Sequence, residues 1–332
     1  MVSLTESSSQ AAEPNDYRVE DQAPFNKQTR RLKLTNRDQY FAALLFATDY
    51  PTHFRLKPEI YPVCTPKGVP VTGSHQYCFI HHQSVMCGHG KIAIPGRDKN
   101  TDLYRKLNFP EDNRPDKWHR GFNLFTLGPS GIQRITKAAW QTTDRITINL
   151  SIDWQTRERN KESGESLLRE ERRYEISQRN QFTIIDHFTN LVPVGESATL
   201  LADRHSFCGV RVNDLIDVED GGTMRDSEGR VNPDGNYWDA NGDRKAPQWV
   251  DCTGRIGSDV AGIALMGHPS NVRNQYYVKD FGLMEVSPAL GEDVTFSKNE
   301  PFRFATRYVA HDGELAGRDA NLLYAEFSKA NY

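Results

Sequence analysis

The sequence lacks the short motifs that mark several large enzyme classes. It contains no GxSxG, no Walker phosphate loop, no GxGxxG and no HExxH. These motifs position a serine nucleophile, nucleotide phosphates, a dinucleotide and a zinc ion, respectively. Serine hydrolases, nucleotide-binding proteins and zincin-type enzymes therefore lose their main sequence support.

Strong charge of one sign and long apolar runs are also missing. The 41 Lys and Arg against 44 Asp and Glu give a formal net charge of -3, so nucleic acid is not an expected partner. The longest apolar run, residues 40–47, is far too short to cross a bilayer, and residues 1–20 show no secretory pattern. We expect a soluble chain without a membrane partner, either cytoplasmic or the mature form of an exported protein; its compartment and any homo-oligomer stay open.

Cysteine is sparse and shows no metal-binding spacing. The five thiols form no CxxC pair, which predicts reduced and mostly buried side chains. From the sequence we assign no metal ligand and expect no cofactor. The cysteines are Cys64, Cys78, Cys87, Cys208 and Cys252.

Alternation of apolar and polar residues is the dominant local pattern. In residues 145–154 every second side chain is apolar, which is typical of a half-buried strand. Only residues 319–329 show helical spacing. The four prolines of residues 57–70 predict edge or loop chain, and the glycine-rich residues 220–243 predict a loop. We therefore predict an all-β protein: a flexible leader over residues 1–25, then one large antiparallel β-sandwich over residues 26–332 with a short C-terminal helix.

Three histidines lie within nine residues in the segment 77–90: His81, His82 and His89. Imidazole is suited to proton transfer or metal binding near pH 7. In a strand, His81 and His82 would point to opposite faces, so a site could use only part of this cluster, and three converging zinc ligands are not expected. We predict His82 and His89 as catalytic, together with His119 of the segment 117–122. His81 and Gln83 would bind substrate.

Further polar residues occur where predicted strands end. Arg273 offers a planar fork for a carboxylate or donors for sugar hydroxyls, and His268 and Asn271 share its loop. The remaining predicted substrate-binding residues are Arg120, His205, Arg211 and Trp249.

Several blocks together resemble the PmoA-like family of unknown function. They are Tyr61-Pro-Val-Cys-Thr-Pro-Lys-Gly-Val-Pro-Val-Thr72, the pair His81-His82, and Gly88-His89-Gly90, followed by Trp249-Val-Asp251, His268-Pro-Ser-Asn271 with Arg273, Asp280-Phe-Gly-Leu283 and His311-Asp-Gly313. The resemblance covers residues 30–330. It implies a β-sandwich of the galactose-mutarotase type and a link to carbohydrate utilisation. The family name refers to a subunit of a membrane-bound methane oxygenase, a function that a chain without a membrane-length run does not support.

The sequence departs from the family pattern in the histidine segment. The pattern HPHHRG reads Phe79-Ile80-His81-His82-Gln83-Ser84 here, and Tyr61 stands where the first block often has a histidine. The first histidine and the basic residue of the pattern are thus missing. This indicates a specialised substrate or a lost activity.

Three function classes remain open from the sequence. The first is a carbohydrate-active enzyme that uses histidine acid/base chemistry in a groove of the sandwich, as a lyase or glycoside hydrolase, with an epimerase ranked after these. Hydrolysis normally needs two carboxylates, for which Asp251 and Glu285 are candidates. The second class is a non-catalytic glycan-binding protein that stacks sugars on Trp118, Trp238 or Trp249. The third is a metal-dependent enzyme.

Overall fold

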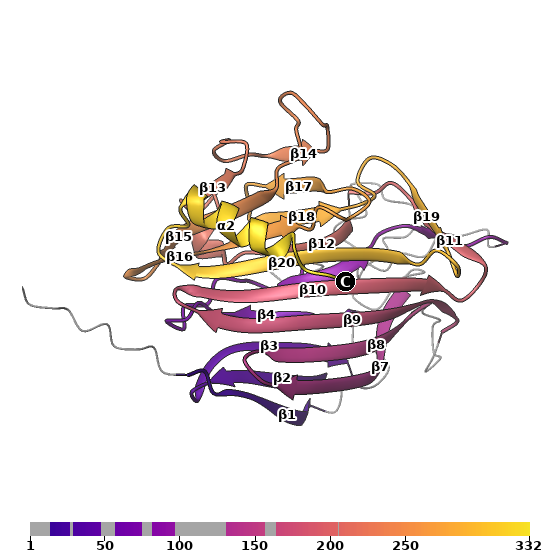
Figure 1. The fold of residues 1–332 in the computed structure, drawn as a ribbon, viewed down its shortest axis with the longest axis horizontal. Coiled ribbons are helices and arrows are strands. Elements are labelled where there is room, and N and C mark those ends of the chain that lie inside the picture. Colours follow the sequence, from indigo (N-terminus) through magenta and orange to yellow (C-terminus); the bar gives the residue numbers. More distant parts are fainter. Residues whose placement is uncertain are drawn as a thin grey trace, which may run out of the picture.

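The structure, a computed structural model, describes residues 14–26, 29–47, 57–74, 82–96, 131–156, 164–204 and 206–332. Within them the chain forms two large antiparallel sheets that face each other (Figure 1). The first sheet has nine strands in the order β1-β2-β3-β4-β5-β12-β18-β17-β14. In that order they are Tyr17–Asn26, Thr29–Asn36, Gln39–Ala47, Glu59–Val63, Val85–His89, Ser206–Arg211, Leu283–Ser287, Gln275–Lys279 and Gly235–Tyr237.

The second sheet has eight strands in the order β13-β15-β16-β20-β10-β9-β8-β7. These are Thr223–Asp226, Trp249–Ile256, Asp259–Gly267, Phe302–Asp312, Phe182–Pro193, Ser166–Arg179, Ile146–Thr156 and Gly131–Thr142. A small sheet is made of β19 (Val294–Ser297), β11 (Ser197–Leu200) and β6 (Ile92–Ala93). In the described part of the chain the helical elements are the 3-10 turn η1 (Asp214–Ile216) and the helix α2 (Gly317–Phe327). The predicted large antiparallel β-sandwich with a short C-terminal helix is confirmed.

The alternation seen in the sequence explains how strand β8 is placed. Ile146, Ile148, Leu150, Ile152 and Trp154 are all buried, whereas the polar residues between them are half-buried or exposed. Side chains of a strand point alternately to its two faces. One face of β8 therefore joins the core between the sheets and the other meets solvent.

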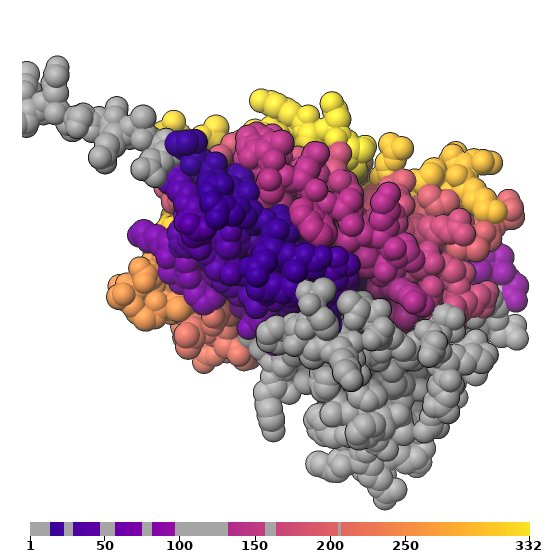
Figure 2. Space-filling view, turned by 90° about the horizontal axis from the view of Figure 1, so that it is seen from below, coloured from indigo at the N-terminus to yellow at the C-terminus, as the bar shows by residue number. Residues whose placement is uncertain are grey.

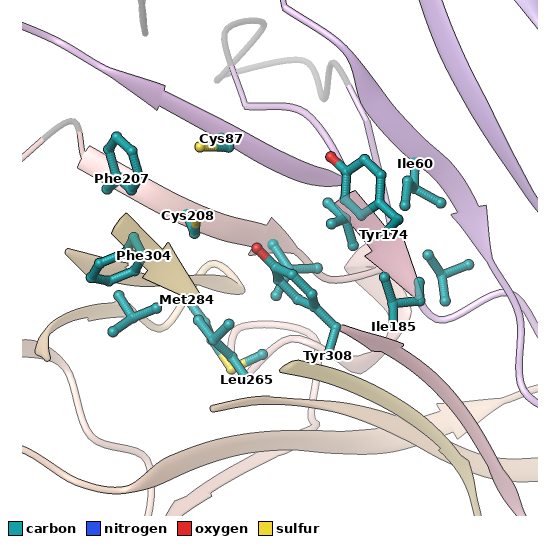
Figure 3. Packing of buried hydrophobic residues seen from close by; sticks show 14 of the residues in the cluster. Ile60, Cys87, Tyr174, Ile185, Phe207, Cys208, Leu265, Met284, Phe304 and Tyr308 are labelled. Atoms are coloured by element: carbon teal, nitrogen blue, oxygen red, sulfur yellow. The ribbon is translucent and has the colours of Figure 1, made fainter. Parts of the chain in front are cut away.

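One continuous apolar core fills the space between the two large sheets, and Figure 3 shows part of it. At one edge of the sandwich β1 contacts β7 and β8. In Figure 2 the indigo N-terminal strands therefore lie next to magenta strands from the middle of the chain. A smaller apolar cluster lies on the outer side of the eight-stranded sheet. There Ala320, Leu323 and Phe327 of α2 pack on residues such as Ala264 and Val309, as expected of an amphipathic helix.

Three segments differ from the sequence prediction. Residues 17–26 form β1, so the sheet begins inside the predicted leader. Strand β4 lies between β3 and β5 although it contains Pro62, because the β3–β4 register shifts between Ala42 and Leu44 and leaves the proline outside the ladder. The predicted loop 220–243 contains the short strands β13 and β14. Within the described residues, no helix is long and apolar enough to cross a membrane.

Candidate active site on the outer face of the nine-stranded sheet

A row of paired residues crosses the outer face of the nine-stranded sheet. In register, Glu59 of β4 opposes Met86, Met86 opposes Gly209, and Gly209 opposes Glu285 of β18. Residues directly opposite each other in a ladder point to the same face. Both carboxylates are buried, at 0% and 1% exposure. We call Glu59, Met86, Gly209 and Glu285 the carboxylate row.

Gly209 leaves room for the side chain of Glu285. Three strand spacings of about 4.8 Å place the Cα atoms of Glu59 and Glu285 about 14 Å apart. A Cβ at position 209 would lie 2.9 Å from Cγ of Glu285 and 3.1 Å from the carbonyl oxygen of Met284. The Glu285 side chain therefore leans over Gly209 toward Glu59, a position that any larger residue at 209 would obstruct.

Glu59 also holds the middle of the histidine segment, at Ser84. Its Oε2 accepts a hydrogen bond from Oγ of Ser74 at 2.6 Å and from the backbone N–H of Ser84 at 3.2 Å. Such charge-assisted bonds are strong for a carboxylate removed from water. Residues 82–84 are thereby held against β4, and Nε2 of Gln83 donates to the carbonyl oxygen of Lys57 at 3.2 Å.

Phe281 brings an imidazole and a guanidinium to the same face. The ring of His82 stacks on Phe281 with centroids 5.8 Å apart and planes 17° apart. The guanidinium of Arg211 lies 5.2 Å from the centroid of the same ring. Arg211 is two residues beyond Gly209 on β12, so it lies on the same face as the carboxylate row. The structure thus brings together two of the predicted residues, His82 and Arg211, through an aromatic residue that the sequence prediction missed.

The charge of Arg211 is compensated within the protein. Its Nη2 donates to Oδ1 of Asp214 at 2.9 Å and lies 3.8 Å from Oδ2 of Asp217. Burial lowers the pKa of Arg211 below its usual value, and the two carboxylates oppose this effect. Burial disfavours the charged form of Asp217 too, and therefore raises the pKa of this carboxyl group. Arg211 is therefore a positioned hydrogen-bond donor rather than an uncompensated positive charge.

His89 connects the end of β5 to Leu201, the residue that follows β11. It is fully buried, and its Nε2 donates to the carbonyl oxygen of Leu201 at 2.8 Å. Burial lowers the pKa of His89 to about 4, so the ring is neutral near pH 7. These contacts are those of a residue that fixes the end of β5, and its predicted catalytic role gains no support from them.

The predicted loop residues His268 and Asn271 lie elsewhere, against the C-terminal helix. The His268 ring packs edge-on against Phe327 and Tyr332, with centroids 4.9 and 5.0 Å away. Asn271 pairs with both backbone groups of Ala305. His82 and His268 thus lie against different surfaces, and these contacts do not bring the two predicted site residues together.

Arg273 and Trp249 are likewise engaged in local contacts. Arg273 donates to the carbonyl oxygens of Pro288 and Asp293 at 2.9 Å each and pairs with Glu292. The indole N–H of Trp249 donates to Asn321 of α2 at 2.8 Å. Their predicted substrate-binding roles remain predictions. His81, His119, Arg120, His205 and the tryptophan Trp118 lie outside the described residues.

Of the two carboxylates named from the sequence, only Glu285 lies in the row. Asp251 lies on the eight-stranded sheet, where its Oδ1 contacts Nε2 of His311 at 2.8 Å. Glu59 was missed because its segment is rich in proline and was predicted as edge or loop chain. A signal was available, since Glu59 and Glu285 both sit in apolar strand segments in which a charged residue is unusual.

A separate cavity of about 310 Å³ lies on the outer side of the eight-stranded sheet, near the C-terminus. The guanidinium of Arg173 covers the ring of Phe188 there at 4.4 Å. The cavity lining combines amides, charges and aromatic rings: Asn149, Glu171, Arg172, Arg173, Phe188, Thr189, Asn190, Arg303 and Tyr332.

The fold and this sheet face define a large antiparallel β-sandwich protein with a buried polar site on one sheet. The chain belongs to the family of unknown function DUF6807, whose sequence profile matches residues 31–325. No curated protein matches the sequence. The coarse form of the resemblance, a family of unknown function, is thus confirmed, whereas the PmoA-like name and the carbohydrate link stay predictions.

Several solved structures are similar over most of the chain. A galactose mutarotase-like protein from Clostridium acetobutylicum aligns with 90% of this chain and 99% of its own, at 9% identity and a TM-score of 0.43. A candidate aldose 1-epimerase from Klebsiella pneumoniae covers 96% of this chain and 90% of its own, at 9% identity and a TM-score of 0.42. At these values the likeness says nothing about a site or an activity.

Proposed function

We propose that this protein is a carbohydrate-active enzyme that acts on a saccharide held on the outer face of the nine-stranded sheet. The observation that carries the proposal is the carboxylate row: two buried carboxylates on one face, with the Glu285 side chain leaning over Gly209. An imidazole and a guanidinium share that face. Acid/base chemistry at a sugar ring needs this kind of set, a proton donor and a proton acceptor with polar groups to orient hydroxyls.

The contacts favour a neutral saccharide over a uronic acid. Eliminative cleavage of a uronic acid needs a cation against the substrate carboxylate. Arg211 is already paired with Asp214 and Asp217, and Lys279 at the same level of the sheet is paired with Asp234. A second anion at Arg211 would meet two carboxylates at close range. The lyase option therefore ranks below hydrolysis or isomerisation of a neutral sugar.

Within this proposal each residue has a distinct role. Glu285 exchanges the proton with the substrate, and Glu59 is its partner on the opposite side of Gly209. His82, held by Phe281, orients a hydroxyl or relays a proton. Arg211 donates hydrogen bonds to the sugar.

A screen of neutral and uronic-acid oligosaccharides, with product masses recorded, tests the proposal. Fragments whose masses sum to the substrate plus one water identify hydrolysis, an unsaturated fragment one water lighter than its hydrolysis counterpart identifies elimination, and a product of unchanged mass identifies isomerisation. Turnover of a neutral sugar that is lost in Glu285→Gln supports the proposal. Turnover of uronic acids alone, or activity that survives the substitution, contradicts it.

Saccharide binding without turnover is the second candidate function, and the cavity beside Tyr332 favours it. Amides and guanidiniums beside two aromatic rings are typical of sugar recognition, where rings contact the sugar face and polar groups contact hydroxyls. Calorimetry with the same sugars separates the two surfaces. Binding abolished by Asn190→Ala but unaffected by Glu285→Gln would place the ligand in the cavity.

A further inference from the structure

A polar cluster lies in the middle of the apolar core, away from both surfaces described above. Cys87 of β5 and Cys208 of β12 are direct register partners, and both are fully buried. Figure 3 shows the two thiols side by side among Phe207, Tyr174 and Tyr308. His187, on β10 of the opposite sheet, completes the cluster.

The ligand atoms of the three side chains lie close to one another. The two Sγ atoms and a ring nitrogen of His187 all lie within 4.8 Å of one another. Nδ1 of His187 is 3.4 Å from Sγ of Cys208. A tetrahedral zinc ion, with Zn–S of about 2.3 Å and Zn–N of about 2.0–2.1 Å, separates such a pair by about 3.5 Å. The spacing of nitrogen and sulfur is that of two ligands of one ion.

The hydrogen bonds around His187 indicate which of its ring nitrogens carries the hydrogen. The hydroxyl of Thr189 donates its one proton to Oε1 of Glu170 at 3.0 Å. Nε2 of His187, 2.9 Å from the same hydroxyl oxygen, must therefore carry the hydrogen and donate it. Nδ1 is left with its lone pair directed at Cys208. A histidine ligand whose second nitrogen donates toward a carboxylate network is the usual arrangement in metal sites.

Charge balance indicates which ion fits. Arg172 donates to both oxygens of Glu170, at 2.6 and 2.8 Å, so this buried pair is neutral. The neutral tautomer of His187 adds no charge. Two thiolates then balance one divalent ion, whereas a monovalent ion would leave a net charge in the core. Oγ1 of Thr306, 3.4 Å from Nδ1 of His187, adds an oxygen atom next to the cluster.

We propose that Cys87, Cys208 and His187 bind one zinc ion that joins the two sheets of the sandwich. Binding would release the two thiol protons and would occur as the chain folds, because all three ligands are closed off from solvent. This site differs from the clustered histidines 81, 82 and 89, for which the sequence did not support a metal. It is independent of the proposed saccharide site on the outer face.

Metal analysis of the full chain, refolded with zinc and then dialysed against a chelator, tests the proposal. We expect close to one zinc per chain in the wild type and less than about a tenth of an equivalent in Cys87→Ser and in Cys208→Ser. The matched control is Cys252→Ser, which removes another buried thiol, one that donates to the carbonyl oxygen of Ile216 at 3.1 Å, and should keep its zinc. The thermal midpoint should rise with zinc during refolding in the wild type and the control only.

A second measurement keeps the test decisive if the cysteine variants do not fold. Wild type refolded with Co²⁺ should show the visible bands of a tetrahedral ion and a near-ultraviolet thiolate-to-cobalt band. Wild type with less than about a tenth of an equivalent of zinc and without these bands overturns the proposal. A disulfide between Cys87 and Cys208, seen by mass as the loss of two hydrogens, overturns it as well.

Discussion

Arg172 in the core offers a sharp test of how the sandwich tolerates buried charge. Arg172 and Glu170 are both fully buried, and Glu170 also accepts hydrogen bonds from Trp154 at 2.7 Å and Thr189 at 3.0 Å. Arg172→Met keeps an apolar side chain of similar length but leaves the carboxylate with only neutral donors. Breaking a buried pair by removing one partner costs about 3–5 kcal/mol. That is a large share of the roughly 5–15 kcal/mol that stabilises a typical fold.

The assay is equilibrium unfolding in urea, followed by both fluorescence and circular dichroism so that coincident curves justify a two-state analysis. Arg145→Met is the matched control, because its pair with Glu175 is exposed and should change the free energy of unfolding by less than about 1 kcal/mol. The double variant Arg172→Met, Glu170→Met should recover much of the loss, since neither charge of this pair then remains in the core. A loss in Arg172→Met as small as that of the control would refute the reasoning.

Two further predictions concern named contacts. Asp251 raises the pKa of the buried His311, so this pair should add stability below about pH 6.5 and lose it as the pH rises through the higher folded pKa. The stability difference between wild type and Asp251→Asn, measured from thermal midpoints, should therefore shrink at alkaline pH; a difference that grows with pH contradicts the assignment. Gly209→Ala should cost about 1–3 kcal/mol in urea unfolding and displace Glu285, whereas Gly195→Ala, whose new methyl group meets nothing within 4 Å, should cost far less. Equal effects of the two alanines would show that Gly209 is not a packing constraint.

The fold could be predicted from local pattern because period-two alternation is a property of each strand. Strand β8 and the helix α2 follow from their own residues, without knowledge of their neighbours. Strand β4 could not be predicted in this way. Its proline is tolerated only because the register with β3 shifts at that point, which is a property of two strands together.

The site was harder to predict because it depends on register between distant segments. Glu59 and Glu285 are 226 positions apart, and their relation rests on the pairings of β4, β5, β12 and β18. His82 and Arg211 were predicted individually, but only the structure shows that Phe281 joins them. His268, also predicted to bind substrate, packs against the C-terminal helix because its loop is fastened to β20 by Asn271.

Turnover by Glu285→Gln tests the central claim most directly. Glutamine keeps the shape of the side chain but cannot exchange the proton, and loss of a general acid or base typically costs about 10²–10⁴-fold in rate. Glu292→Gln, on an exposed carboxylate paired with Arg273, is the matched control. With a neutral oligosaccharide that the wild type converts, the account predicts a loss of kcat of at least about 10²-fold in Glu285→Gln and an unchanged rate in Glu292→Gln. Equal rates in the wild type and both variants would contradict it.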